Sequence, residues 1–143
     1  MMDITQAILQ NSEFLISLIA VFIAAISAYA AIKNIHLSRI SFQRTTTLQT
    51  EIFILNAYKE YVGTMYDKNA SDEYRQEART QFLMAIDLYC KYVINGHLDK
   101  KLSDDNLHFF EECILAFRDI IKNDIQNYNN IADYVKKYNI SLD

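Results

Sequence analysis

Two small groups of cations are the residues whose types and spacing best suit chemistry in this sequence. Arg75 and Arg79 lie four positions apart, so on a helix they project from the same face. Lys100 and Lys101 share a short segment with His97. Guanidinium and ammonium groups match phosphate oxygens, so both groups are candidate binding sites for a phosphate-bearing ligand.

A plainer interpretation stands beside this one, in which these cations are solvated and Asp72 and Glu73 pair with the two arginines. Nothing else in the sequence indicates catalysis. It contains no GxSxG motif, no glycine-rich phosphate loop and no Cys-His pair at a plausible spacing. The adjacent carboxylates are expected at helix starts or on solvated faces. We therefore expect a protein that is not an enzyme and that has no catalytic residue.

The cysteines and the charge balance exclude further classes of function. Cys90 and Cys113 lie in apolar helical patterns, which predicts two buried thiols in a reducing compartment. No CxxC or HExxH motif indicates a metal, and no cofactor is expected. The chain is mildly acidic, with a net charge of −4, so binding to duplex nucleic acid is not expected.

These groups follow an uncharged stretch, residues 14–32, which predicts a transmembrane helix. Nineteen helical residues at about 1.5 Å each span roughly the hydrocarbon thickness of a bilayer. The rest of the chain is too short to enclose such a helix and also to build its own core. The alternative is a signal peptide cleaved near the AYA motif at residues 28–30, although no basic residue precedes the stretch.

Cations occur only after the apolar stretch. Lys33, Arg39 and Arg44 follow it and no Lys or Arg precedes it. The positive-inside rule then places the C-terminal part in the cytoplasm and residues 1–13 outside, as a short acidic leader. We expect the three cations to meet anionic lipid headgroups. The predicted location is the inner membrane of the cell, with a single pass.

Small and polar residues recur along this stretch at alternating spacings of three and four, as in a heptad repeat. Such residues let membrane helices approach closely, so the pattern predicts self-association into a homo-oligomer. The alternative is a chance stripe, since Ala and Ser are common in membrane helices. The predicted packing seam comprises Ser17, Ala20, Ala24, Ser27 and Ala31, and the same spacing continues through Asn34, Ser38, Ser41 and Thr45.

Residues 33–66 form a connector without Pro and without Gly before Gly63, which favours continued helix. Three consecutive threonines at residues 45–47 are its weak point, because β-branched residues lose rotamer freedom in a helix. The connector is therefore either one long helix or a helix with a hinge at the threonines. An apolar stripe supports helix along it: Leu48, Ile52, Leu55, Tyr58 and Val62.

Residues 67–143 predict a small helical bundle, so the fold class is all-α. A loop at residues 67–71 precedes a helix that Ser71 caps and that ends near Gly96. Residues 97–106 are expected to be a loop, and Ser103 is expected to cap a further helix reaching residue 125. A break at residues 123–130 and a short terminal helix complete the bundle.

The order of these parts resembles that of small bacterial membrane proteins, in the basic segment "IHLSRISFQRTTTLQ" and the run "LYCKYVINGHLDKKLSDDNLHFFEECILAFRDII". Similar layouts occur in the membrane-bound accessory effectors of type III CRISPR systems, whose cytoplasmic domain binds cyclic tetra-adenylate. The resemblance implies an anti-phage effector in which a cyclic oligoadenylate binds an oligomer and perturbs the membrane. No catalytic residue transfers from it.

Two functions are therefore expected from the sequence. The first is the membrane-anchored effector gated by a cyclic oligoadenylate. The second is a scaffold or immunity-type membrane protein that binds a protein partner through its helical domain and presents an exposed aromatic patch.

Overall fold

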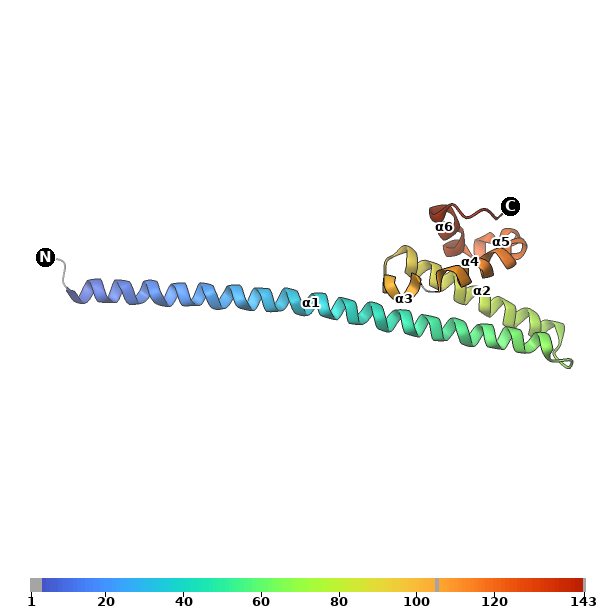
Figure 1. The fold of residues 1–143 in the computed structure, drawn as a ribbon, viewed down its shortest axis with the longest axis horizontal. Coiled ribbons are helices and arrows are strands. Elements are labelled where there is room, and N and C mark those ends of the chain that lie inside the picture. The colour runs from blue at the N-terminus through green and yellow to red at the C-terminus, as the bar shows by residue number, and fades with distance from the viewer. Residues whose placement is uncertain (1–3, 105, 143) are drawn as a thin grey trace. The chain divides into compact units, whose positions relative to one another are not determined.

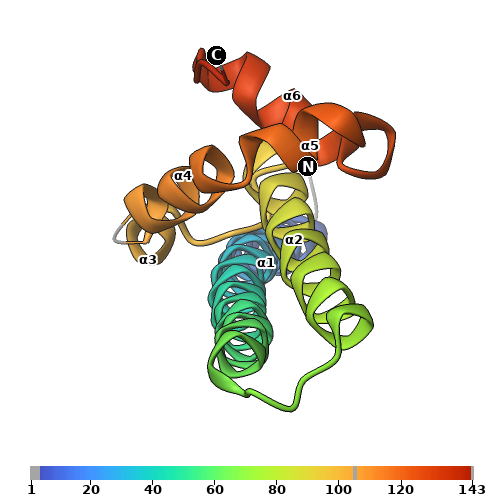
Figure 2. The ribbon, with the colours of Figure 1, turned by 90° about the vertical axis from the view of Figure 1, so that its right-hand side faces the viewer.

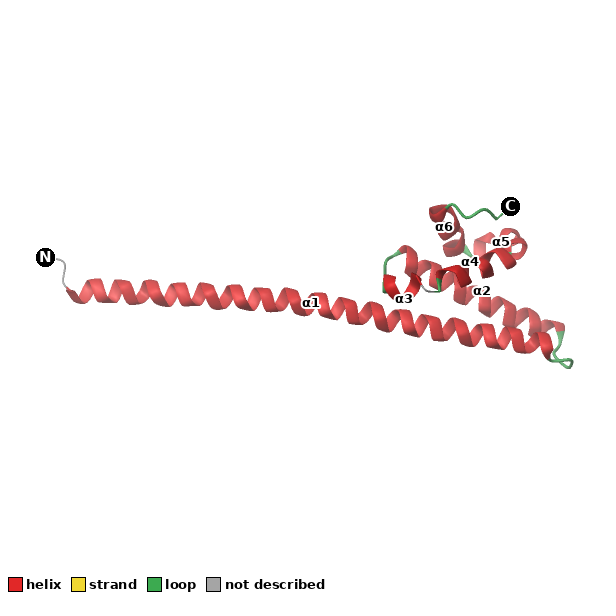
Figure 3. Ribbon diagram, in the orientation of Figure 1, coloured by secondary structure: helices red, strands yellow, loops and turns green. Residues whose placement is uncertain are grey.

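The computed structural model of the protein describes residues 4–104 and 106–142. Helices and their connections account for all of this part of the chain, and it contains no strand (Figure 3). The all-α prediction is confirmed. The chain divides into two units, Met1–Ile40 and Ser41–Asp143. Of the expected leader, residues 1–3 lie outside the described residues, and residue 4 already begins a helix.

The first helix, α1, runs from Ile4 to Tyr66 without a break (Figure 1). Of the two alternatives for the connector, the long helix is thus confirmed and the hinge is not seen. Thr47 and Thr50 lie within this helix, and each hydroxyl donates to the carbonyl four residues earlier, at 2.8 Å and 2.7 Å. This bond lets a threonine occupy a buried helical position with its polar group satisfied.

The first unit holds the uncharged stretch. Its large apolar side chains are more than half exposed, and an 18-residue window reaches a mean hydropathy of 2.5 with none of it buried. This helix is long and apolar enough to cross a membrane. All five predicted seam residues are likewise exposed in the single chain: Ser17, Ala20, Ala24, Ser27 and Ala31.

The second helix, α2, spans Asp72–Ile94 and has the predicted ends. The Ser71 hydroxyl accepts a hydrogen bond from the Tyr74 amide at 3.1 Å, which caps the helix start. Gly96 adopts φ 66°, a left-handed conformation that costs glycine little, and the chain turns away there. Both boundaries were predictable because they depend on residues next to the helix.

The next segment differs from the prediction. Residues 97–106 are not simply a loop, since Lys100–Asp104 forms a short helix, α3. Ser103 does not cap the following helix. It is buried inside α3, where its hydroxyl donates to the Lys100 carbonyl at 3.2 Å. Asp99 caps α3 instead, accepting a hydrogen bond from the Lys101 amide at 3.1 Å.

The prediction of one helix reaching residue 125 is also wrong, because this segment is divided into shorter elements. Helix α4 spans Leu107–Ala116, α5 spans Arg118–Asn123, and a 3₁₀ turn, η1, spans Ile125–Asn127. The break falls at Phe117, whose ring packs against Tyr61 and Phe82 at centroid distances of 5.5 Å and 6.0 Å. Packing against residues distant in sequence accompanies the break, and the local pattern did not show it.

The expected terminal helix is present as α6, Asn129–Tyr138. Its start is capped from another helix. The Asp87 carboxylate of α2 accepts hydrogen bonds from the Ile131 amide at 2.9 Å and from the Asn130 side chain at 2.6 Å. A carboxylate near the first turn of a helix also suits the positive end of the helix dipole.

In the second unit, α2 lies between residues 41–66 of α1 and α6 (Figure 2). The core is continuous and mostly aliphatic and aromatic, with Ile86, Tyr89, Ile131 and Tyr134 fully buried. Cys90 and Cys113 are buried and free, which confirms the expected burial of both thiols. Burial raises the pKa of Cys113 to about 11 and raises the pKa of Cys90 further.

Two neighbouring α2 positions test this core. Ile86 is fully buried and Met84 is 60% exposed. Ile86→Ala leaves a cavity and should lower the free energy of unfolding by about 2–5 kcal/mol, whereas Met84→Ala should change it by less than about 0.5 kcal/mol. Urea unfolding of the full chain in detergent, followed by circular dichroism, measures both. Equal losses in the two variants would contradict the described packing.

Candidate functional site

Arg75, the first of the predicted phosphate ligands, lies in the first turn of α2, and its side chain reaches the C-terminal end of α1. Its guanidinium donates to the Thr64 carbonyl at 3.3 Å and to the Asp67 carbonyl at 3.1 Å, and it lies 3.8 Å from the Asp72 carboxylate. The last carbonyls of a helix lack intrahelical partners, and arginine is suited to satisfy them. Arg75 thus fixes the turn between α1 and α2.

Arg79 has different neighbours. Its side chain is partly buried and its charge acts on Tyr128. Burial raises the pKa of the Tyr128 hydroxyl, and the Arg79 cation opposes that rise. The two arginines share α2, but the described bonds of Arg75 are directed at backbone carbonyls and at Asp72. A joint phosphate site at this pair stays a prediction.

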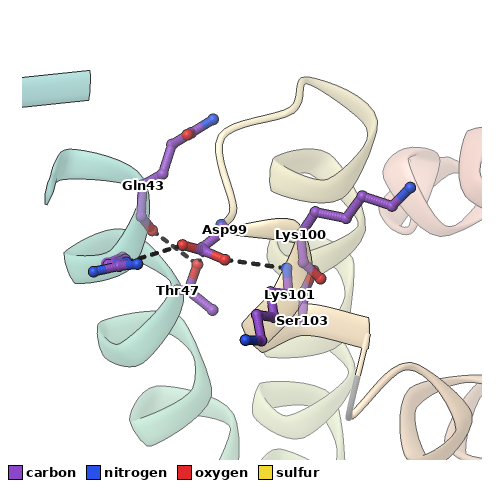
Figure 4. Close-up of polar contacts among 7 residues, drawn as sticks. Gln43, Thr47, Asp99, Lys100, Lys101 and Ser103 are labelled. Atoms are coloured by element: carbon purple, nitrogen blue, oxygen red, sulfur yellow. Dashed lines mark hydrogen bonds and ion pairs between the residues drawn. The ribbon is translucent and has the colours of Figure 1, made fainter. Parts of the chain in front are cut away.

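The second predicted group lies around the start of α3. His97, Lys100 and Lys101 are all exposed. The two lysine side chains extend in different directions (Figure 4). Lys100 lines a hollow of about 300 Å³ together with the aromatic ring of Tyr138. Sequence reasoning did not anticipate this partner, because Tyr138 comes from the far end of the chain.

Of the three predicted headgroup ligands, Lys33 and Arg39 are exposed on α1 in the first unit. Arg44 lies in the second unit and forms an ion pair there. Its Nε atom is 3.2 Å from the Asp99 carboxylate, with the Arg44 side chain 65% exposed and that of Asp99 17% exposed. A pair this exposed contributes roughly 0–1 kcal/mol. Contact of Arg44 with lipid stays a prediction.

Next to Arg44, a set of polar contacts joins α1 to the segment between α2 and α3 (Figure 4). We call Gln43, Thr47, Gly96 and Asp99 the Thr47 latch. The Asp99 amide donates to the Thr47 hydroxyl at 2.8 Å, and the Gln43 side chain donates to the Gly96 carbonyl at 2.9 Å. Thr47 is fully buried, so its hydroxyl is shielded from competing water.

The most distinctive surface of the second unit is a groove between α1 and α4, which we call the α1–α4 groove. Its volume is about 430 Å³. The Glu51 carboxylate lies in its wall and accepts a hydrogen bond from the Asn106 side chain at 3.0 Å. Apolar and aromatic side chains form most of the remaining lining: Leu48, Ile52, Ile54, Leu55, Tyr58, Phe109 and Phe110.

Several lining residues are unusually exposed for their type. Leu48, Ile52 and Leu55 are 51%, 59% and 64% exposed, and Phe109 is 39% exposed. The Tyr58 ring packs edge-on against Phe109 at 5.6 Å, which holds the two walls together. Such a groove suits the apolar face of a helix. Carboxylate, thiol and imidazole groups arranged for a metal are not found among the described residues.

The sequence shows the apolar residues of α1 that line this groove, but it does not show that α4 forms the other wall. The stripe of Leu48, Ile52 and Leu55 indicates a helix but does not show which element lies beside it. It is the neighbouring face of α1 that packs on the domain, through Thr47, Thr50, Ile54 and Thr64. Three of these four residues are threonines, so hydropathy alone does not identify this face of α1 as the buried one.

Thr47 and Thr50 form a matched pair for testing the latch, since both are buried and both donate to their own helix. Only Thr47 also accepts the Asp99 amide. Thr47→Val should leave that amide without a partner and lower the free energy of unfolding by about 1–3 kcal/mol, whereas Thr50→Val should cost under about 1 kcal/mol.

Urea unfolding gives both energies, and hydrogen exchange of the peptide containing Asp99 reports the latch directly. Exchange there should accelerate in Thr47→Val and not in Thr50→Val. Unchanged exchange in Thr47→Val would show that this bond does not hold the segment.

Comparison with known proteins supplies no relative for this arrangement: no protein-family model, no curated protein and no solved structure matches the chain. The groove, the latch and the Lys100 hollow must therefore be interpreted from their chemistry. Of these, the groove is the one lined mainly by exposed apolar side chains.

Proposed function

We propose that the protein is a single-pass membrane protein whose helical domain is a binding module for an apolar helix of a protein. Residues 14–32 cross the bilayer, and the cations that follow them keep the domain in the cytoplasm. The exposed apolar side chains of the first unit support the membrane crossing, because lipid would cover the side chains that the protein leaves exposed.

The observation that carries the proposed binding function is the α1–α4 groove. Soluble surfaces rarely expose several neighbouring large apolar side chains unless they bind something. Here Leu48, Ile52 and Leu55 lie at helical spacing beside the ring of Phe109. Helix-in-groove recognition uses this pattern of anchors along one face. The rings of Tyr58 and Phe109, which are 36% and 39% exposed in this groove, also support a scaffold, for which an exposed aromatic patch is expected.

We propose the cyclic-oligoadenylate effector as a second candidate function, favoured by the Lys100 hollow. An exposed tyrosine ring can stack on a base and a neighbouring ammonium group can meet phosphate. Tyr138 is 44% exposed and lines this hollow together with Lys100. Asp104 lines it too, and its charge opposes an anion.

The anchoring statement predicts the behaviour of the full chain on fractionation. The protein should sediment with membranes and remain there after extraction with alkaline carbonate, which releases peripheral proteins. Replacing three residues of the stretch together, Ile19→Asn, Phe22→Asn and Ile26→Asn, should release it, because several polar side chains at bilayer depth are costly. Release of the unaltered chain by carbonate would reject the anchor.

The second candidate predicts that cyclic tetra-adenylate binds the full chain in detergent, as measured by isothermal titration calorimetry. Lys100→Ala together with Tyr138→Ala should weaken that binding by at least several-fold, because both a phosphate contact and a stacked base are lost. Lys122→Ala, outside the hollow, is the control. The absence of binding heat for the unaltered chain, at any ring size, would reject this candidate.

A further inference from the structure

The structure assigns two different faces to residues 41–66 of α1. One face packs on the helical domain and is buried or partly buried: Thr47, Thr50, Ile54, Ala57, Tyr61 and Thr64. Leu48, Ile52 and Leu55 lie on another face and stay more than half exposed. At 3.6 residues per turn, these three side chains form one stripe. The described side chains of the domain thus leave this apolar stripe mostly uncovered.

We infer that this face of α1 packs against the same face of a second copy of the chain, in a parallel pair centred on Leu48, Ile52 and Leu55. The inference rests on the proposed function, since it names the partner of the groove. Such a contact is isologous, with the same three side chains contributed by each copy. The Tyr58 and Phe109 rings flank the stripe within the groove and limit the approach of the second helix.

The sequence register favours a second copy over an unrelated helix. The three-four alternation of small residues reaches Thr45, and Leu48, Ile52 and Leu55 continue it as 3, 4 and 3. In this frame Ile52 takes an a position and both leucines take d positions, the arrangement that favours a parallel two-stranded pair.

Membrane insertion supplies the parallel orientation. Every copy enters the bilayer the same way round, because the cation asymmetry is the same in each. Equivalent residues of two copies therefore lie at equal depth below the membrane. Confinement to one surface also raises the effective concentration of the second copy. Three apolar levels are fewer than the three to four heptads typical of a free coiled coil, so the pair depends on this confinement.

The charges beside the stripe are compatible with the pair. In a parallel pair, Arg44 of one copy lies toward Gln49 of the other, and Glu51 lies toward Asn56, so like charges do not meet. The next a position is Lys59, where two cations would oppose each other. The apolar pairing therefore ends after Leu55, at the end of the groove stripe.

Disulfide cross-linking in native membranes tests the pair with the full chain. Leu48→Cys and Leu55→Cys place a thiol at the proposed contact, whereas Phe53→Cys places one on another face of the same turns, where Phe53 is 51% exposed. The unaltered chain is a further control, because Cys90 and Cys113 are buried. Under mild oxidation, Leu48→Cys and Leu55→Cys should give several-fold more disulfide-linked dimer than Phe53→Cys.

A charged residue in the stripe should abolish the excess of disulfide-linked dimer that Leu55→Cys gives over Phe53→Cys. Ile52→Glu, in the Leu55→Cys chain, opposes two carboxylates and should reduce the dimer several-fold, whereas Ile52→Val should retain it. Ile52 is 59% exposed, so either change should alter the stability of one copy by no more than about 0.5 kcal/mol. Equal cross-linking at Phe53 and Leu55 overturns the inference. So does its absence at all three positions, which would leave lipid or another protein as the occupant.

Fractionation of the same samples separates this inference from the proposed function. A protein that sediments with membranes but lacks the cross-linking pattern keeps its anchor and loses only the pairing. A protein found in the aqueous fraction loses the anchor itself.

Discussion

The hydrogen bond from the Asp99 amide to the Thr47 hydroxyl is the contact on which the rest of the second unit depends. Thr47 is fully buried and its hydroxyl uses its single donor on the Gln43 carbonyl, which leaves an acceptor for Asp99. With the amide held, the Asp99 carboxylate is directed at the start of α3 and at Arg44. Valine would fit the same space and leave the Asp99 amide without this acceptor. One hydroxyl therefore links α1 to the α2–α3 segment and, through Asp99, to the start of α3.

Fixing α1 in this rotation decides which of its faces remains free. The face that carries Thr47, Ile54 and Thr64 is buried, and the aromatic contacts of Tyr61 with Phe82 and Phe117 complete its packing. The stripe of large aliphatic residues is consequently turned outward. A helix selected only for packing on its own domain would place its leucines inward and its threonines outward. The reversed arrangement is accounted for if a second helix covers the aliphatic stripe.

The predictable parts of the fold were those encoded by neighbouring residues. The Ser71 hydroxyl caps α2 by accepting a hydrogen bond from the amide of Tyr74, three residues later. Gly96 ends the helix because glycine adopts a left-handed conformation easily. Both boundaries were therefore predictable from the sequence. The errors at Ser103 and Phe117 share another cause. Asp99, held by Thr47 from 52 residues away, caps α3, a short helix that contains Ser103 and lies within the expected loop. At Phe117, aromatic packing with Tyr61 accompanies the break. Arg75 was identified as a cation suited to oxygen ligands, and its described hydrogen-bond acceptors are carbonyl oxygens of the chain itself.

The latch and the aliphatic stripe occupy the same turns of α1. Leu48 follows Thr47 directly, so a helix packed on Leu48 restricts the turn that holds Asp99. Asp99 in turn caps α3, whose first residue, Lys100, lines the hollow with Tyr138. The stripe, the latch and the hollow are thus linked one to the next: Leu48 is adjacent to Thr47, Thr47 holds Asp99, and Asp99 caps the helix that begins at Lys100.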